Sequence, residues 1–130
     1  MCTYTFFMTE NSTTIDSSCM SRQAAADKIA RILDAQFFRA LCEPVRIEII
    51  LVLIRKGRSD VGAIAEELPQ DRSVISRHLQ VLERGGIVCA SQEGRHVFYE
   101  LDASTSVQRF EAILGQLRAL LPLCCPAKPR

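Results

Sequence analysis

Two adjacent cysteines near the carboxyl end are the residues of this sequence best suited to chemistry. Cys124 and Cys125 lie between Pro122 and Pro126. Neighbouring side chains on a helix point about 100° apart, so a vicinal pair within a helix is a poor chelate. Because proline disfavours helical geometry at the residue before it, we expect the pair on an extended or turned tail over residues 122–130, where both sulfurs can reach one ion. Thiolates prefer soft acceptors such as trivalent arsenic or antimony, mercury, cadmium or copper(I).

The other cysteines are isolated along the chain: Cys2, Cys19, Cys42 and Cys89. A lone cysteine is usually a small buried hydrophobic residue, and this interpretation stays open for Cys42 and Cys89. A thiol enzyme is not indicated, because the sequence has no Cys-x-x-Cys motif and no phosphate-binding glycine loop. The basic residues near the pair are Lys128 and Arg130 at the end of the tail. We therefore predict that the chain is not an enzyme.

The composition is typical of a small, helix-rich globular protein. The 130 residues suffice for one domain with a hydrophobic core, and 48% of them are hydrophobic and 24% charged. No apolar run approaches the roughly 18 to 20 residues that span a bilayer, so no membrane segment is expected. The formal net charge of +1 decides little, because a protein that reads DNA needs basic groups on one surface only.

Residues 1–20 are rich in Ser and Thr and lack the basic and apolar regions of a secretory signal. We expect them to form a flexible tail, and translation could start at Met8 or Met20. Without an export signal, we expect a cytoplasmic protein whose cysteines are reduced thiols.

Apolar periodicity and chain breakers predict the first helices. Apolar residues at three- and four-residue steps predict one long helix or two helical pieces over residues 21–41. Pro44 suits the first turn of the next helix, which Gly57 ends. A short helix then runs from about Asp60 to Pro69.

A further helix and a hairpin follow. Asp71 is placed to cap a helix over residues 72–84, which two glycines end. Two β-prone runs, 87–90 and 96–101, flank a glycine-containing turn and predict a hairpin. The last helix, from residue 103 to about 121, is too apolar to face water alone, so we expect it to pack on the first helix and on a partner subunit.

These elements predict a mostly α fold with a small β-hairpin, a winged helix-turn-helix over residues 21–121. The second helix of such a motif enters the major groove of DNA. The candidates for DNA contact on this helix are Arg72, Ser73, Ser76, Arg77, His78 and Gln80. For His78 a structural or phosphate-contacting role is favoured over metal ligation, because no second histidine stands at ligand spacing. Arg95 at the hairpin tip can reach a phosphate or the minor groove.

A less specific interpretation is that the arginines of this helix merely solvate an exposed face. A winged-helix module that binds only protein would also not need them, and replacing Arg77 by Ala would then leave its function intact. The order of capped helix, paired glycines and hairpin favours DNA contact over both.

Five segments together resemble the ArsR/SmtB repressor family: residues 40–47, 64–68, 73–82, 86–88 and 93–101. The string Ser-Arg-His-Leu-x-Val-Leu, followed at wing distance by Gly-Arg-x-x-x-Tyr, is the most specific part, and the resemblance covers roughly residues 30 to 120. It implies a homodimer with the first and last helices at the interface. Such a dimer binds an imperfect palindrome at its own promoter and releases it when an inducer binds.

Two metal sites common in this family are not matched. Asp60 and Gly62 stand where the resemblance would place a Cys-x-Cys string, and no histidine follows Asp102 and Glu111 to complete a site on the last helix. A zinc or cobalt sensor of those types is therefore not indicated.

The resemblance to arsenic-responsive repressors with a carboxyl-terminal cysteine pair makes trivalent arsenic or antimony the predicted inducer. Trivalent arsenic takes three sulfurs, and Cys42 is the favoured third ligand because it lies near where the last helix of a family dimer packs. Cys19 and Cys89 stay open for this role. The alternative is a redox or persulfide sensor of the same fold, in which the pair forms a disulfide or polysulfide with Cys42. DNA binding itself is expected to need no cofactor.

Overall fold

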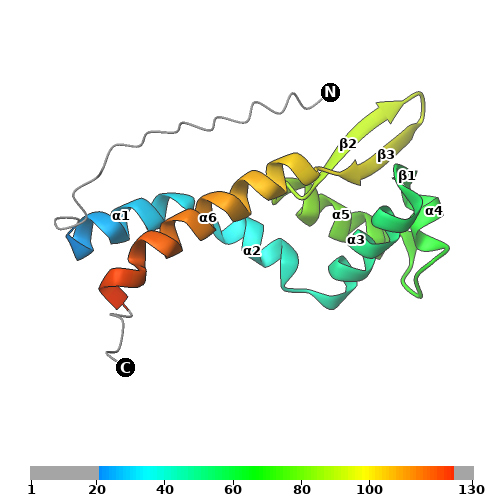
Figure 1. Ribbon diagram of the computed structural model, residues 1–130. Coiled ribbons are helices and arrows are strands. Elements are labelled where there is room, and N and C mark those ends of the chain that lie inside the picture. Colours follow the sequence, from blue (N-terminus) through cyan, green and yellow to red (C-terminus); the bar gives the residue numbers. More distant parts are fainter. Residues whose placement is uncertain (1–20, 125–130) are drawn as a thin grey trace. The chain divides into compact units, whose positions relative to one another are not determined.

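The computed structural model describes the backbone of residues 21–124 and the side chains of residues 21–123. These residues form a mostly α structure with a small antiparallel sheet (Figure 1). In chain order the elements are α1 (Arg22–Ile32), α2 (Ala35–Leu41), α3 (Pro44–Lys56), β1 (Ser59–Asp60), α4 (Val61–Ala65), α5 (Arg72–Arg84), β2 (Val88–Glu93), β3 (His96–Leu101) and α6 (Ala103–Cys124). They divide into two compact units, one over residues 34–106 and one made of residues 21–33 and 107–124.

The unit over residues 34–106 has its own hydrophobic core. Helices α2, α3, α4 and α5 and the two longer strands contribute to it, and the buried side chains are Phe37, Ala40, Ile49, Val52, Leu53, Ile64, Ile75, Leu79, Leu82, Ile87, Val88 and Tyr99. The helix-turn-helix and the hairpin therefore share one core, which sets the position of α5, the second helix of the motif, relative to the hairpin.

The first predicted helix is two pieces, which was one of the two alternatives left open. Ser21 accepts a hydrogen bond from the backbone N–H of Ala24 at 3.1 Å and caps α1. Asp34 accepts one from the N–H of Gln36 at 2.9 Å and caps α2. Each helix thus has its own polar start, and the chain breaks between Ile32 and Ala35.

The predicted start and stop of α3 are confirmed. Pro44 occupies its first turn, and Gly57 ends it with a φ of 77°, a conformation that glycine adopts without steric cost. The prediction for Asp71 is only partly right. It stands at the N-cap of α5, but its side chain makes no capping hydrogen bond.

The hairpin is longer than predicted, and the sheet has a strand that the sequence did not reveal. Strand β2 continues through Ser91, Gln92 and Glu93, and β3 pairs with β2 on one edge and with β1 on the other. The two-residue strand β1 pairs Ser59 with Tyr99. The two-residue connection has a positive φ at Gly94 (60°) but not at Arg95, which is the pattern of a type II′ turn.

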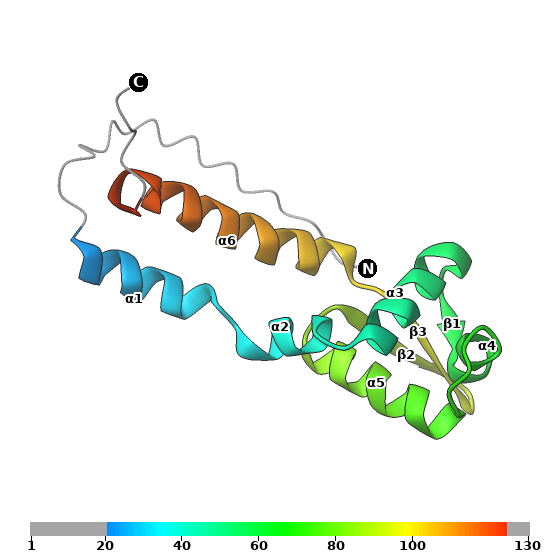
Figure 2. The same cartoon turned by 90° about the horizontal axis from the view of Figure 1, so that it is seen from below.

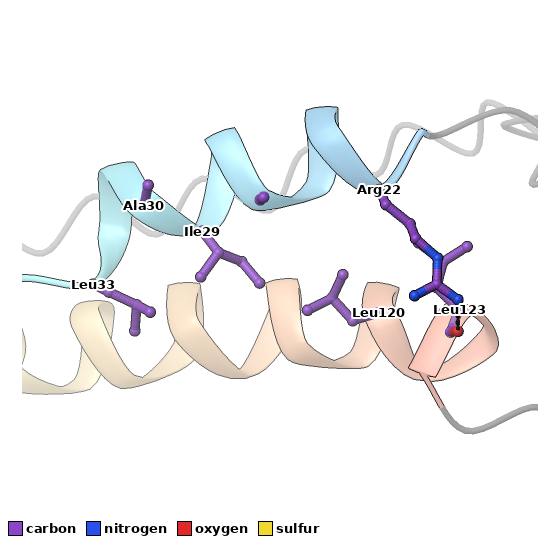
Figure 3. A pocket seen from close by; sticks show the side chains of 7 residues that line it. Arg22, Ile29, Ala30, Leu33, Leu120 and Leu123 are labelled. Carbon is purple, nitrogen blue, oxygen red and sulfur yellow. Dashed lines mark hydrogen bonds between the residues drawn. The ribbon is translucent and has the colours of Figure 1, made fainter.

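In the other unit, α1 and the part of α6 after residue 106 run side by side in opposite directions (Figure 2). Arg22 at the start of α1 donates a hydrogen bond to the backbone carbonyl of Leu123 at 3.2 Å. Between the two helices lies an apolar groove of about 380 Å³, lined among others by Ile29, Leu33 and Leu120 (Figure 3). In the described part of the chain, no helix combines the length and the apolar character that crossing a membrane requires.

The expectation of a non-helical tail from residue 122 onward is wrong for residues 122–124. Helix α6 continues through Pro122 to Cys124, so Cys124 belongs to its last turn and is not on an extended segment. Proline costs least where few hydrogen bonds remain to be lost, and here it removes only the bond to the carbonyl of Arg118. The expectation for Cys125 and residues 126–130 lies outside the described residues, as does the one for residues 1–20.

Candidate nucleic-acid interface

Helix α5 carries a polar face opposite a buried one. Ser73, Arg77 and Gln80 follow one another at steps of four and three residues, so they share one face, and all three are exposed. The opposite face is fully buried, with 0% exposure at each of Ile75, Leu79 and Leu82. Burial of this row presents the polar row outward.

Arg84 extends the polar row of α5 by one more turn. It lies seven residues after Arg77 and is exposed, and the sequence analysis did not include it among the DNA-contact candidates. The signal was available, because the spacing 73–77–80–84 can be read from the sequence.

The other candidates on α5 lie at the margins of this face. Ser76 and His78 are half-buried, and Arg72 is exposed. The guanidinium of Arg72 lies against α4, where a Cβ added to Gly62 would come within 3.2 Å of its Nη2. His78 Nδ1 lies 3.3 Å from Nη1 of Arg46 on α3. His78 on α5 therefore contacts a side chain of α3.

Polar contacts fix the first helix of the motif and the turn after it. Asp60 Oδ1 accepts a hydrogen bond from the backbone N–H of Ala63 at 2.8 Å and caps α4, while its Oδ2 lies 3.7 Å from Nδ1 of His96. Lys56 pairs with Glu67 at 2.9 Å, and this hydrogen bond and charge lower the pKa of the Glu67 carboxyl. Asp60 thus joins the helix-turn-helix to the hairpin.

The hairpin is attached to the rest of the unit through Arg58. Its Nη2 donates to Ser91 Oγ at 3.1 Å and pairs with Glu93 Oε1 at 2.8 Å. The guanidinium carbon also lies 4.2 Å from the centroid of the Phe98 ring, a cation–π contact. Arg95 is exposed at the hairpin turn, which projects beyond the helices of this unit (Figure 1).

The cysteines with described side chains do not form a metal site by themselves. Cys42 is exposed, ends α2 and donates its thiol to the carbonyl of Phe38 at 3.1 Å. Cys89 is half-buried on β2, with its Sγ 3.8 Å from the carbonyl of Glu100. Among residues 21–123, no group of three or more His, Cys, Asp and Glu side chains is arranged to hold a metal ion. The side chains of Cys124 and Cys125 lie outside that range.

Two residues that could belong to a metal site instead shape the fold. Asp102 accepts hydrogen bonds from the N–H of Thr105 at 3.1 Å and from its hydroxyl at 2.8 Å, so it caps the start of α6. Asp60 caps α4 in the same way, as described above. Both carboxylates have helix-capping roles that need no ion.

A short helix, a turn, a helix with an outward polar face and an attached antiparallel hairpin define the winged helix-turn-helix class. The comparisons with known proteins agree with this class. A helix-turn-helix domain family matches residues 41–88. The uncharacterized HTH-type transcriptional regulator MJ1325 of Methanocaldococcus jannaschii is 38% identical over 65 residues, which are 50% of this chain and 73% of that protein.

Two further similarities indicate the family. The arsenical resistance operon repressor of Escherichia coli K12 is 33% identical over 70 residues, or 54% of this chain and 60% of that protein. The solution structure of the homodimeric winged helix-turn-helix domain of Mb0332 from Mycobacterium bovis, a possible ArsR-family regulator, is 26% identical with a TM-score of 0.51 and covers 87% of this chain and 99% of that one. This chain belongs to the ArsR/SmtB family of winged helix-turn-helix transcriptional regulators. It spans 53 to 62% of the length of several other curated regulators that it matches.

Proposed function

We propose that this chain is a DNA-binding transcriptional repressor that works as a homodimer and leaves its operator when a thiophilic metalloid binds its cysteines. The observation that carries the proposal is the exposed row of Ser73, Arg77 and Gln80 on α5, held outward by a fully buried row on the same helix. Arginine forks, amides and hydroxyls are the groups that read base edges in the major groove.

The wing supplies a second point of attachment to DNA. Arg95 is exposed at the tip of a hairpin whose position Arg58 fixes. An arginine there contacts a neighbouring phosphate or enters the minor groove, which sets the orientation of α5 without reading sequence.

Dimerisation is proposed through α1 and α6. Five large apolar side chains of α6 follow one another at steps of three and four residues and are 44 to 55% exposed: Val107, Phe110, Leu114, Leu117 and Leu121. This spacing is the one that packs a helix against another helix. The apolar groove between α1 and α6 adds surface that a second copy would remove from water. The homodimeric neighbour from M. bovis supports a dimeric assembly.

The dimer is tested by replacing Leu114 with Glu, since a charge in an apolar seam opposes association. Sedimentation velocity should show a dimer for the unmodified protein and a monomer for the variant. A matched control is Glu111→Gln, on the same helix and exposed. A monomeric unmodified protein at micromolar concentration would overturn this part of the proposal.

For the inducer we propose trivalent arsenic or antimony bound by Cys124, Cys125 and a third thiol. The support is chemical, because soft thiolates bind such ions and a pyramidal site takes three of them. Cys42 is the preferred third ligand, since it is exposed. The arsenical resistance repressor among the relatives favours this class of inducer.

The same thiols allow a second candidate inducer, an oxidant or a persulfide. Cys42 is exposed, so an oxidant can reach it from solvent, which favours this candidate. In that case the pair would form a disulfide or polysulfide with Cys42, and peroxide or polysulfide would release DNA while arsenite would not.

The experiment is a binding titration of the reduced protein with a labelled fragment of its own promoter. Arsenite, antimonite, cadmium, mercury and zinc are then added separately, and release is followed by fluorescence anisotropy. Allosteric coupling in proteins is typically about 5- to 150-fold, and arsenite should weaken DNA binding by an amount near the upper end.

The variant with Cys124 and Cys125 both changed to Ser should bind DNA normally and ignore arsenite. Cys89→Ser is the matched control and should respond like the unmodified protein, whereas Cys42→Ser should respond weakly. A double variant that still releases DNA on addition of arsenite would show that the pair is not the sensor. Failure to bind the promoter at any salt concentration would end the repressor proposal itself.

A further inference from the structure

Arg46, in the first turn of α3, bonds to the end of the preceding helix. Its Nε donates to the carbonyl of Ala40 at 2.8 Å, and its Nη2 donates to the carbonyl of Arg39 at 2.7 Å. The last carbonyls of a helix have no partner within the helix, so a side chain that reaches two of them caps it. Arg46 therefore holds the carboxyl end of α2, the turn that also carries Cys42.

The same guanidinium reaches the recognition helix. Its Nη1 lies 3.3 Å from Nδ1 of His78 on α5, a contact between residues 32 positions apart in the sequence. A guanidinium stays protonated and has donors only, so Nδ1 must be the acceptor. The proton of the neutral imidazole then resides on Nε2.

The second ring nitrogen of His78 is not fully buried. His78 stands between exposed Arg77 and buried Leu79 and is itself half-buried. Among residues 21–123, the ring forms a hydrogen bond with Arg46 alone, through Nδ1, and Nε2 is not closed off from solvent. The Nε2–H is therefore accessible to water at the edge of the polar face of α5.

We propose that Arg46 is a positioning residue that fixes His78 as a neutral Nε2–H donor to a backbone phosphate of bound DNA. This inference rests on the proposed DNA binding. A phosphate oxygen is a strong, sequence-independent acceptor, and a donor whose tautomer is set in advance loses nothing to reorganisation when DNA arrives. His78 then positions α5 in the groove, while Ser73, Arg77 and Gln80 face the bases.

Two substitutions separate this role from a purely structural one. In His78→Asn the amide oxygen can occupy the place of Nδ1 and keep the contact with Arg46, but nothing replaces Nε2–H. In His78→Gln the longer amide can present an N–H near the place of Nε2, but the acceptor for Arg46 is lost. Thermal unfolding monitored by circular dichroism establishes that both variants are folded.

The affinity for promoter DNA is then measured by anisotropy. A charge-assisted hydrogen bond corresponds to about tenfold or more in affinity, so His78→Asn should bind at least about tenfold more weakly, and equally so on unrelated sequences. His78→Gln should stay within about threefold of the unmodified protein. The reverse order, with Asn tolerated and Gln harmful, would mean that His78 only supports Arg46 and would overturn the proposal.

A second readout needs no DNA. Nitrogen-15 chemical shifts of the His78 imidazole in the free protein at neutral pH should show that Nε2 is protonated and Nδ1 is not. In the Arg46→Met variant, both tautomers should be observed. Nδ1 protonated in the unmodified protein would overturn this inference while leaving DNA binding intact. An unmodified protein that binds no promoter DNA, with the expected tautomer present, would instead remove the proposed function on which the inference rests.

Discussion

Helices α5 and α6 have opposite relations to their own chain. Three of the 13 residues of α5 are buried, and they hold the helix in the core of the unit over residues 34–106. Helix α6 has 22 residues, and none of its described side chains is buried, although five large apolar ones follow a helix-packing pattern. Helix α5 is therefore stabilised within one chain, whereas α6 keeps exposed the apolar side chains that we propose as part of a dimer interface.

The largest expected effect on stability comes from the buried row of α5. Leu79→Ala removes a side chain with 0% exposure and should lower the free energy of unfolding by about 2 to 5 kcal/mol, because the cavity left behind cannot fully close. Urea denaturation at several protein concentrations measures this, and the loss should not depend on concentration.

Leu117→Ala is the matched control on α6, since Leu117 is 49% exposed. Its effect should appear as a weaker dimer, and hence as a stability that depends on concentration more steeply than in the unmodified protein. Equal and concentration-independent losses in the two variants would erase the contrast between the helices.

Glycines at the two helices sharpen the same contrast. Gly85 ends α5, and a Cβ there would lie 2.8 Å from the Cβ of Ala40 and 3.3 Å from the backbone carbonyl of Gln36. Gly85→Ala should therefore cost about 1 to 3 kcal/mol through overpacking. Gly115, within α6, has nothing within 4 Å of such a Cβ.

Gly115→Ala should be neutral or should stabilise the monomeric Leu114→Glu background by up to about 1 kcal/mol, since alanine favours a helix over glycine. Thermal unfolding of both alanine variants in that background makes the comparison. A stabilising Gly85→Ala would mean that α2 and the end of α5 approach less closely than described.

The hairpin is largely exposed, but DNA binding should still be sensitive to substitutions that weaken its attachment to the rest of the unit. Arg58→Ala removes the contacts to Ser91, Glu93 and Phe98 together, so DNA binding should weaken by about three- to tenfold as the hairpin loses its fixed position. Arg58→Lys keeps the charge but not the planar fork and should show an intermediate loss. Anisotropy titrations report both, and an Arg58→Ala protein with unchanged affinity would mean that the wing needs no such attachment.

The smallest effect expected is a pH dependence of stability that arises from Tyr99 in the core of the unit over residues 34–106. Tyr99 is 6% exposed, and burial, with a smaller contribution from the charge of Glu83, raises the pKa of its phenol. The unfolded chain therefore ionises first, and stability is lost as the pH rises past the ordinary value of about 10 toward the raised one. Melting temperatures between about pH 8 and about pH 11 should fall less for Tyr99→Phe than for the unmodified protein. An identical fall in both would assign the alkaline loss to other groups.

Most of the fold could be predicted from the sequence because the residues that end its helices act through local backbone geometry. Pro44, Gly57 and the glycines after α5 set helix ends by backbone geometry alone, and the buried row of α5 was readable from its spacing. Strand β1 was missed because two residues carry no periodicity. Strand β2 was predicted too short because its second half consists of exposed residues and shows no alternation of buried and exposed positions. The end of α6 was misplaced because proline within a last turn costs little.

The candidate interface was predictable where it depends on one helix and not where it depends on distant partners. The residues of α5 follow from its periodicity. Arg46 and Arg58 could not be singled out, because their partners stand 32 and 33 or more positions away and only folding brings them together. The cysteine pair remains a prediction from thiol chemistry alone, because α6 continues through Pro122 to Cys124.

The attachment of Arg58 to the hairpin has a consequence for how quickly and how tightly any partner can engage its tip. A loop that samples many arrangements must give up that freedom on association, and the loss subtracts from the interaction energy. Here the contacts of the Arg58 guanidinium with Phe98 and Glu93 reduce that freedom before a partner arrives. Arg95, at the tip of this hairpin, therefore has less conformational freedom to lose when it contacts an incoming surface.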